Sequence, residues 1–308
     1  MMTDPVFLPN FIIAGAPKAG TSSVFAWIAE HPDALGSREK ETYFFVDPGT
    51  HMYRPEAHVS QGFAAYGDQF VLPAGPAPKV ILESTPAYIY YRTALERIPD
   101  LPSQPRCLFI LREPAAQIYS LYTYFRDNWS WIPGDMSFAE FLAAVRAGSH
   151  DFKGNELARN ALAQGRYIDY LLPWRERLGA ERIMVATFDE LLADQRGLTK
   201  RVAEWVGLDP AFYDDFAFPR ENETYAPRNR LLQNVNVAIR GLLPKGAFYE
   251  NLRGVYRRLN TRAPSGPSDA EGAEVARLRG EFTEANARLA EEFGLDLSRW
   301  HRKEPARA

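Results

Sequence analysis

A short apolar run that ends in a glycine-bracketed loop limits the folds open to this chain more than any other feature. Residues 11–14 (Phe-Ile-Ile-Ala) are apolar, and the loop that follows runs from Gly15 to Gly20. Three hydroxyl residues, 21–23, come next and lead into a stretch with helical spacing of its apolar side chains, which are Val24, Trp27 and Ile28. The pattern predicts a strand, a tight loop and a helix that ends near His31.

Three more short apolar runs follow the same plan. They occupy residues 80–82, 107–111 and 183–186. Helical patterns follow the runs at 107–111 and 183–186. Continuous apolar runs that alternate with helices are typical of parallel strands buried on both faces. We therefore expect an α/β protein with a P-loop-like three-layer fold, in which helices flank a central parallel sheet.

The remaining segments are expected to form loops and helices that cover that sheet. We expect a loop with one short helix over 46–78, two helices over 137–178, a helical stretch over 188–206, a Pro/Gly/Ser-rich break over 261–269 and one charged amphipathic helix over 270–293. We found no internal repeat. We expect a single domain over 1–308, with a core at about 10–235 and a C-terminal helical extension at about 236–308.

Composition excludes several classes of function. The 308 residues carry 36 Lys and Arg against 39 Asp and Glu, so a net charge of −3 argues against a protein that coats nucleic acid or an acidic membrane. Cys107 is the only cysteine and is expected in a strand, which favours a reducing, cytoplasmic setting without disulfides. No run resembles a membrane anchor or an export signal, and no Cys/His spacing resembles a metal site.

The loop departs from the ATP-binding P-loop in one informative way. Gly15 and Gly20 have the P-loop spacing, but Thr21 stands where the P-loop lysine belongs, and the loop's lysine is Lys18. The start of a helix still favours a phosphate. A lysine inside the loop is placed to neutralise the bridging oxygen of a shorter phosphate anhydride as that group leaves.

At this loop the sequence resembles the PAPS-dependent sulfotransferases, whose 5′-phosphosulfate loop reads much like the PKAGTSS of residues 17–23. A second family element is an apolar strand that ends in Arg with Ser eight residues later, and Arg112 and Ser120 match it. The resemblance covers about residues 10–235. It implies that Arg112 and Ser120 bind the 3′-phosphate of PAPS.

Two further stretches are similar to the branch that sulfates carbohydrates, such as the heparan sulfate enzymes. Residues 38–45 look like its K-E-x-x-x-F stretch, whose Glu is the catalytic base, and this implies Glu41. Residues 83–88 look like its E-K-T-P-x-Y stretch, but Ser84 replaces the lysine. Residues 222–230 resemble the segment that closes over the 3′-phosphate, which implies Arg228 as a contact, with Arg230 as its rival.

The resemblance implies a sulfotransferase that moves the sulfuryl group of PAPS to a hydroxyl of a carbohydrate, small-molecule or lipid acceptor and releases PAP. It implies Lys18 at the leaving group, Glu41 as first and Glu83 as second choice of base, no metal, and no nucleic-acid partner. Two roles stay open for Lys40: contact with the substrate, or an ion pair with Glu39 or Glu41. The implied PAPS-binding residues are Pro17, Lys18, Ala19, Gly20, Thr21, Ser22, Ser23, Arg112, Ser120 and Arg228.

Two other functions are compatible with the same loop. A nucleotide kinase that uses ATP and Mg²⁺ lacks its lysine at position 21, and a nucleotide-binding module without catalysis would bind PAP but transfer nothing. The five histidines are candidates for a base, as in the small-molecule branch. None follows a strand at a suitable place, so we expect His31 to be structural and the others to be solvated; these are His51, His58, His150 and His301.

Overall fold

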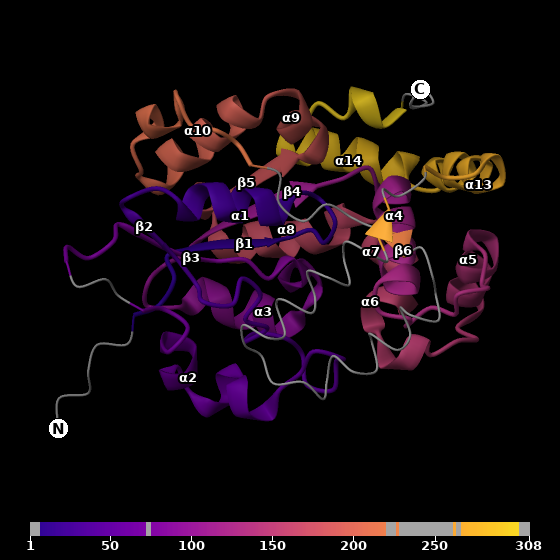
Figure 1. The fold of residues 1–308 in the computed structure, drawn as a ribbon, viewed down its shortest axis with the longest axis horizontal. Helices are drawn as coiled ribbons and strands as arrows, with labels where there is room; N and C mark the ends of the chain where they lie inside the picture. The colour runs from indigo at the N-terminus through magenta and orange to yellow at the C-terminus, as the bar shows by residue number, and fades with distance from the viewer. Residues whose placement is uncertain (1–6, 72–74, 220–225, 228–260, 263–265, 302–308) are drawn as a thin grey trace. The chain divides into compact units, whose positions relative to one another are not determined.

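Strands and helices alternate along much of the chain (Figure 1). This computed structural model describes residues 7–71, 75–219, 226–227, 261–262 and 266–301. The strands are β1 (Phe11–Gly15), β2 (Ala34–Gly36), β3 (Val80–Glu83), β4 (Arg106–Leu111), β5 (Ile183–Thr187), β6 (Ala226–Pro227) and β7 (Thr261–Arg262). The α-helices are α1 (Thr21–Ala29), α2 (Ala64–Gly67), α3 (Arg92–Arg97), α4 (Pro114–Asp127), α5 (Phe138–Ala147), α6 (Glu156–Arg159), α7 (Ala161–Gln164), α8 (Tyr167–Leu178), α9 (Phe188–Ala193), α10 (Gln195–Val206), α13 (Asp269–Gly280) and α14 (Thr283–Phe293).

The first five strands form one sheet in the order β2-β3-β1-β4-β5. Every neighbouring pair in it is parallel, from β2 with β3 to β4 with β5. This confirms the expected α/β fold with a central parallel sheet. Because β1 lies between β3 and β4, the loop after β1 emerges between the segments that follow those two strands.

Helices cover both faces of this sheet. On one face, apolar side chains of α1 and α10 pack against alternate residues of β1 and β4, such as Ile13 and Ile110. On the other face, the Phe109 ring of β4 contacts the Trp174 ring of α8, with centroids 5.3 Å apart. Figure 1 shows α10 and α3 on opposite sides of β1 and β3. The strands are thus buried on both sides, as their unbroken apolar runs predict.

Packing divides the chain into two compact units. Among the described residues, the first unit is drawn from 1–113, 166–222 and 283–301 and carries the five-stranded sheet. The second is drawn from 114–165 and 223–282 and carries α4 to α7, α13 and the antiparallel pair of β6 and β7. The single domain over 1–308 stays a prediction.

Three details differ from the sequence-based expectation. The edge strand β2 was not predicted, because three residues give no usable periodicity. The stretch 188–206 is two helices, since the Asp194 side chain accepts the Gly197 N–H at 2.8 Å and starts α10. The single helix over 270–293 is wrong: α13 ends at Gly280, and the turn that follows lets Phe282 be buried.

The coverings are more segmented than expected. Between the two predicted helices of 137–178, α5 and α8, the chain forms the short helices α6 and α7 and a 3₁₀ turn over Phe152–Gly154. Residues 46–78 hold α2, as the expected short helix, and two 3₁₀ turns, Pro55–Ala57 and Val59–Gln61. Such short turns leave too little pattern in a sequence to be predicted.

Candidate functional site

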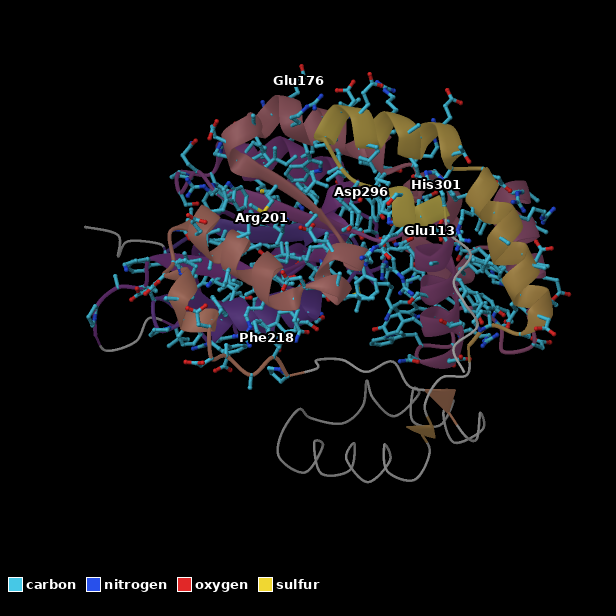
Figure 2. The ribbon with its side chains drawn as sticks, turned by 90° about the horizontal axis from the view of Figure 1, so that it is seen from above. Glu113, Glu176, Arg201, Phe218, Asp296 and His301 are labelled. Atoms are coloured by element: carbon cyan, nitrogen blue, oxygen red, sulfur yellow. The ribbon has the colours of Figure 1, made fainter. Side chains whose placement is uncertain are left out.

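Four chain segments meet at the carboxyl edge of the first unit's sheet. The loop 16–20 follows β1, residues 84–85 follow β3, and Arg112 follows β4. Residues 37–45 come after β2 and run past them, because the Ser84 N–H donates to the Lys40 carbonyl at 3.1 Å. Glu113, labelled in Figure 2, directly follows Arg112 in the chain and is buried. Ligand sites of open α/β sheets lie at this edge.

The glycines of the loop are required by its geometry. Gly20 precedes α1 with φ +84°, and a Cβ built there would lie 2.5 Å from Leu191 Cδ2. A Cβ on Gly15 would lie 2.9 Å from Ile89 Cβ. The Ala16 N–H donates to the Ile110 carbonyl at 2.7 Å, which fixes the loop beside β4. The backbone therefore takes a path that side chains at 15 and 20 would block.

The rest of the loop carries the other predicted PAPS-binding residues. Pro17 is partly exposed and Ala19 is buried. Thr21 is the first residue of α1 and is 4% exposed, whereas Ser22 and Ser23 are half-buried in its first turn. Backbone N–H groups at such a helix start favour an anion.

Lys18 is held in the middle of the loop in a left-handed conformation, with φ +64°. Burial and the nearby Arg112 lower the pKa of its ammonium group to about 8, with a smaller contribution from Lys40, while Glu41 acts in the opposite direction. These effects place Lys18, Arg112, Lys40 and Glu41 in one electrostatic group. A cluster with this excess of positive charge suits a phosphate or sulfate ligand.

Arg112 is placed by contacts on two sides. Its Nη1 donates to the Lys18 carbonyl at 3.3 Å, and its guanidinium lies over the Phe188 ring, 5.0 Å from the centroid. Phe188 begins α9 directly after β5, so three strand ends fix this one side chain. A cation over an aromatic ring gains about 0.5–1 kcal/mol at exposed sites. Sequence reasoning missed Phe188; its place directly after a buried strand was the only signal.

Glu41 and Lys40 form an ion pair at the same edge. Lys40 Nζ lies 3.0 Å from Glu41 Oε1, and the two side chains are 19% and 36% exposed. The Tyr43 hydroxyl donates to the other carboxylate oxygen of Glu41. Of the two roles left open for Lys40, the structure shows the pairing with Glu41.

Glu83, by contrast, is fully buried at the end of β3. Its carboxyl group accepts hydrogen bonds from the Thr85 hydroxyl, at 2.6 Å, and from the Tyr66 hydroxyl. Burial raises its pKa, and these hydroxyls act in the opposite direction. The two candidate bases thus occupy different surroundings, one open to solvent and one enclosed by hydroxyl groups.

The hydroxyls around Glu83 also hold the segment that carries Glu41. Thr85 Oγ1 accepts the Tyr43 N–H at 3.4 Å, and Tyr88 OH accepts the Phe45 N–H at 3.3 Å. Tyr43 itself has a left-handed backbone, with φ +53°. A non-glycine residue with that conformation needs support from its surroundings. The buried network supplies it and so fixes the position of Glu41.

For two predicted residues the structure gives no position relative to this group. Ser120 lies in α4, in the second unit, and is half-buried. Arg228 and its rival Arg230 lie outside the described residues. The assignment of Ser120 and Arg228 to the 3′-phosphate therefore stays a prediction.

The expectation that His58 is solvated is wrong, because it is 4% exposed and its Nε2 lies 3.1 Å from the Val46 carbonyl oxygen. His31 is structural as expected: it is 3% exposed, and its Nδ1 accepts the Asp33 N–H at 3.1 Å. Cys107 is a buried residue of β4, and burial raises the pKa of its thiol. A buried, protonated thiol is unreactive.

None of the helices that the structure describes is long and apolar enough to cross a membrane. Within the same residues, no group of three or more His, Cys, Asp or Glu side chains is arranged to hold a metal ion.

Comparison with known proteins finds relatives named as heparan sulfate sulfotransferases. Over 204 residues, 65% of this chain, it is 28% identical to mouse heparan sulfate glucosamine 3-O-sulfotransferase 3B1. It is 21% identical over 210 residues, 67% of the chain, to mouse bifunctional heparan sulfate N-deacetylase/N-sulfotransferase 4. The chain spans 46% of the first relative and 23% of the second.

A solved structure supports the fold. The sulfotransferase from Alicyclobacillus acidocaldarius superposes with a TM-score of 0.66 at 21% identity, over 96% of this chain and 100% of that one. The family model for the sulfotransferase domain matches residues 8–223, which is more than half of the chain and includes every segment of the site described above. The chain therefore belongs to the sulfotransferase family.

Proposed function

We propose that this protein transfers the sulfuryl group of PAPS to a hydroxyl group of an acceptor and releases PAP. One observation carries the proposal: Lys18 and Arg112, from the ends of β1 and β4, gather with the Glu41 carboxylate at one sheet edge. Fixed cations suit a phosphosulfate, and a carboxylate beside them suits an acceptor hydroxyl that must lose its proton.

We assign the donor-binding roles as the family resemblance implies and as the chemistry of each group allows. Lys18 neutralises the bridging oxygen as the phosphate departs, and the loop from Pro17 through the hydroxyls of Ser22 and Ser23 holds the 5′-phosphate. Arg112 takes the 3′-phosphate, together with Ser120 and Arg228. A planar guanidinium and a hydroxyl are suitable partners for a phosphate dianion.

We assign Glu41 as the general base. Its side chain is 36% exposed and so is open to an acceptor, whereas Glu83 is 0% exposed and accepts hydrogen bonds from Thr85 and Tyr66. A base must reach the proton it takes. Glu83 then serves the structure of the site, through the hydroxyls that support residues 43 and 45.

The proposed step is a direct displacement at sulfur. The acceptor oxygen forms a bond to sulfur while the bond from sulfur to the bridging phosphate oxygen breaks. Glu41 takes the proton of the acceptor hydroxyl, and the electron pair of the broken bond stays on the departing phosphate, which Lys18 stabilises. Positioning and electrostatics supply most of the catalysis in such a transfer, by analogy with phosphoryl transfer.

For the acceptor we propose a carbohydrate hydroxyl. The support comes from the relatives, whose names describe heparan sulfate sulfotransferases, and from residues 40–45, which match that branch. We propose that the reaction requires no metal, and that the protein acts in the cytoplasm without a nucleic-acid partner. The single buried cysteine and the net charge of −3 support these last two points.

A label-transfer assay tests the proposal. The protein is incubated with ³⁵S-labelled PAPS and heparan sulfate in the presence of EDTA, with simple sugar, phenol and sterol acceptors in parallel. We expect labelled polysaccharide and an equal amount of PAP. Transfer of phosphate from ATP that depends on Mg²⁺ would favour a kinase instead, and PAP binding without transfer to any acceptor would favour a binding module.

A further inference from the structure

A second ammonium group lies beside Glu41, and the steps proposed above give it no role. Lys40 Nζ is 3.0 Å from Glu41 Oε1 and 3.4 Å from the carbonyl oxygen of Ser84. The Lys40 side chain is only 19% exposed. By comparison, Lys79, which pairs with Asp33 at 2.6 Å, is 63% exposed.

The backbone fixes where Lys40 delivers its charge. The Ser84 N–H donates to the Lys40 carbonyl at 3.1 Å, while Lys40 Nζ returns to the Ser84 carbonyl, so residues 40 and 84 are joined at both ends of the lysine. Ser84 directly follows β3, the neighbour of β1. The Lys40 ammonium is thereby held at the strand edge from which the Lys18 loop emerges.

The small side chain at position 84 suits this arrangement. Ser84 is 0% exposed, and its hydroxyl has no hydrogen-bond partner among the described residues. Its contribution to the site is therefore made by its backbone, which receives the ammonium group of Lys40. The ammonium group beside residue 84 thus comes from Lys40, on the segment that follows β2, and not from residue 84 itself.

The Lys18 ammonium group lies near two other cations. Lys18 interacts electrostatically with Arg112, Lys40 and Glu41, and the two cations lower its pKa. Like charges held together in a partly buried site disfavour each other, and a bound anion relieves that repulsion. A ligand with several negative charges therefore suits this group of cations.

We propose that Lys40 is a further catalytic residue that binds the sulfuryl oxygens of PAPS and that releases Glu41 as it does so. The inference rests on the proposed function. In the free protein the ammonium group of Lys40 neutralises Glu41. When the sulfuryl group enters, the ammonium group turns to its oxygens, stays protonated, and leaves Glu41 Oε1 open to the proton of the acceptor. No covalent bond to Lys40 forms.

Comparing PAPS with PAP isolates this contact, because the two ligands differ by the sulfuryl group alone. Binding is measured by calorimetry at low temperature without acceptor, for the wild type, Lys40→Met and Lys40→Arg. We expect Lys40→Met to bind PAP within about twofold of the wild type but PAPS about tenfold more weakly. Its kcat for transfer to heparan sulfate should fall about 100-fold, as when one oxyanion donor is removed, and Lys40→Arg should recover much of it.

Lys79→Met is the matched control, because it removes an ammonium group from an exposed ion pair just before β3 and should leave both ligands and kcat unchanged. If Lys40→Met keeps the wild-type ratio of PAPS to PAP affinity, or weakens both ligands equally, the inference is overturned. Failure of the proposed function looks different, since the wild type itself would then bind no PAP and transfer no sulfate.

Discussion

The affinity for PAP should fall steeply above pH 8, because the ammonium group of Lys18 loses its proton there. Burial and Arg112 lower the pKa of Lys18 to about 8 in the free protein. A group with that pKa is about 90% protonated at pH 7 and about 10% protonated at pH 9. If the charged form is the one that binds the 5′-phosphate, the Kd for PAP rises about tenfold between these two pH values. Arg112 stays charged throughout.

The assay is calorimetric titration with PAP at half-unit steps from pH 6.5 to 9.5 at constant ionic strength, because salt screens such contacts. The phosphates of PAP are already ionised over most of this range. Lys18→Met is the control: it should bind PAP more weakly at pH 7 than the wild type does at pH 9, and it should lose the pH dependence. A wild-type Kd that stays constant to pH 9.5, or a Lys18→Met variant that keeps the wild-type slope, would refute the reasoning.

Replacing the neighbours of Lys18 should shift its pKa, and with it the pH midpoint of PAP binding, in opposite directions. Glu41 raises the pKa of Lys18, so Glu41→Gln should move the midpoint of the PAP titration below pH 8. Lys40 lowers it, so Lys40→Met should move the midpoint upward. Shifts in the same direction for both variants would contradict the electrostatic grouping of these residues.

Three further predictions concern the loop and the two glutamates. Gly20→Ala should lower the free energy of unfolding by about 1–2 kcal/mol for its left-handed backbone and by a further ~1–3 kcal/mol for the contact with Leu191; Gly49→Ala, with the same φ of +84° but open space around it, should show the first cost alone in urea unfolding. Glu41→Gln should lower kcat by about 10²–10⁴, and Glu83→Gln should change it much less; the reverse result would assign the base to Glu83. Because burial raises the pKa of Glu83, its contribution to stability is present below pH 4.5 and is lost as pH rises through the folded pKa, so the stability of the wild type relative to Glu83→Gln should fall over that window.

The order of the site segments could be predicted from the sequence because each follows a buried strand. The apolar runs at 11–14 and 107–111 predict strands that are buried on both faces. Because these strands are parallel, Lys18 and Arg112 follow them at the same edge of the sheet. The glycines at 15 and 20 are needed where the structure shows close approaches, to Ile89 and Leu191. Local pattern and tertiary structure agree at these positions.

What the sequence does not reveal is how residues from different strands support one another. The carboxyl group of Glu83 is enclosed by Tyr66 and Thr85, and Tyr66 comes from the stretch 46–78, whose pattern predicts a short helix without fixing its position. The contact of Lys40 with Ser84 joins positions 44 residues apart and depends on the unpredicted strand β2. Such contacts follow from the order of strands in the sheet, which no local periodicity encodes.

Titration of the wild-type protein with PAP tests the central claim most directly, because we propose that Lys18 and Arg112 bind the phosphates of this ligand. ATP with Mg²⁺ is titrated in parallel. The account predicts PAP binding in the micromolar range that needs no metal, together with much weaker binding of ATP. No detectable PAP binding at millimolar concentration, or tight binding of ATP that depends on Mg²⁺, would contradict it.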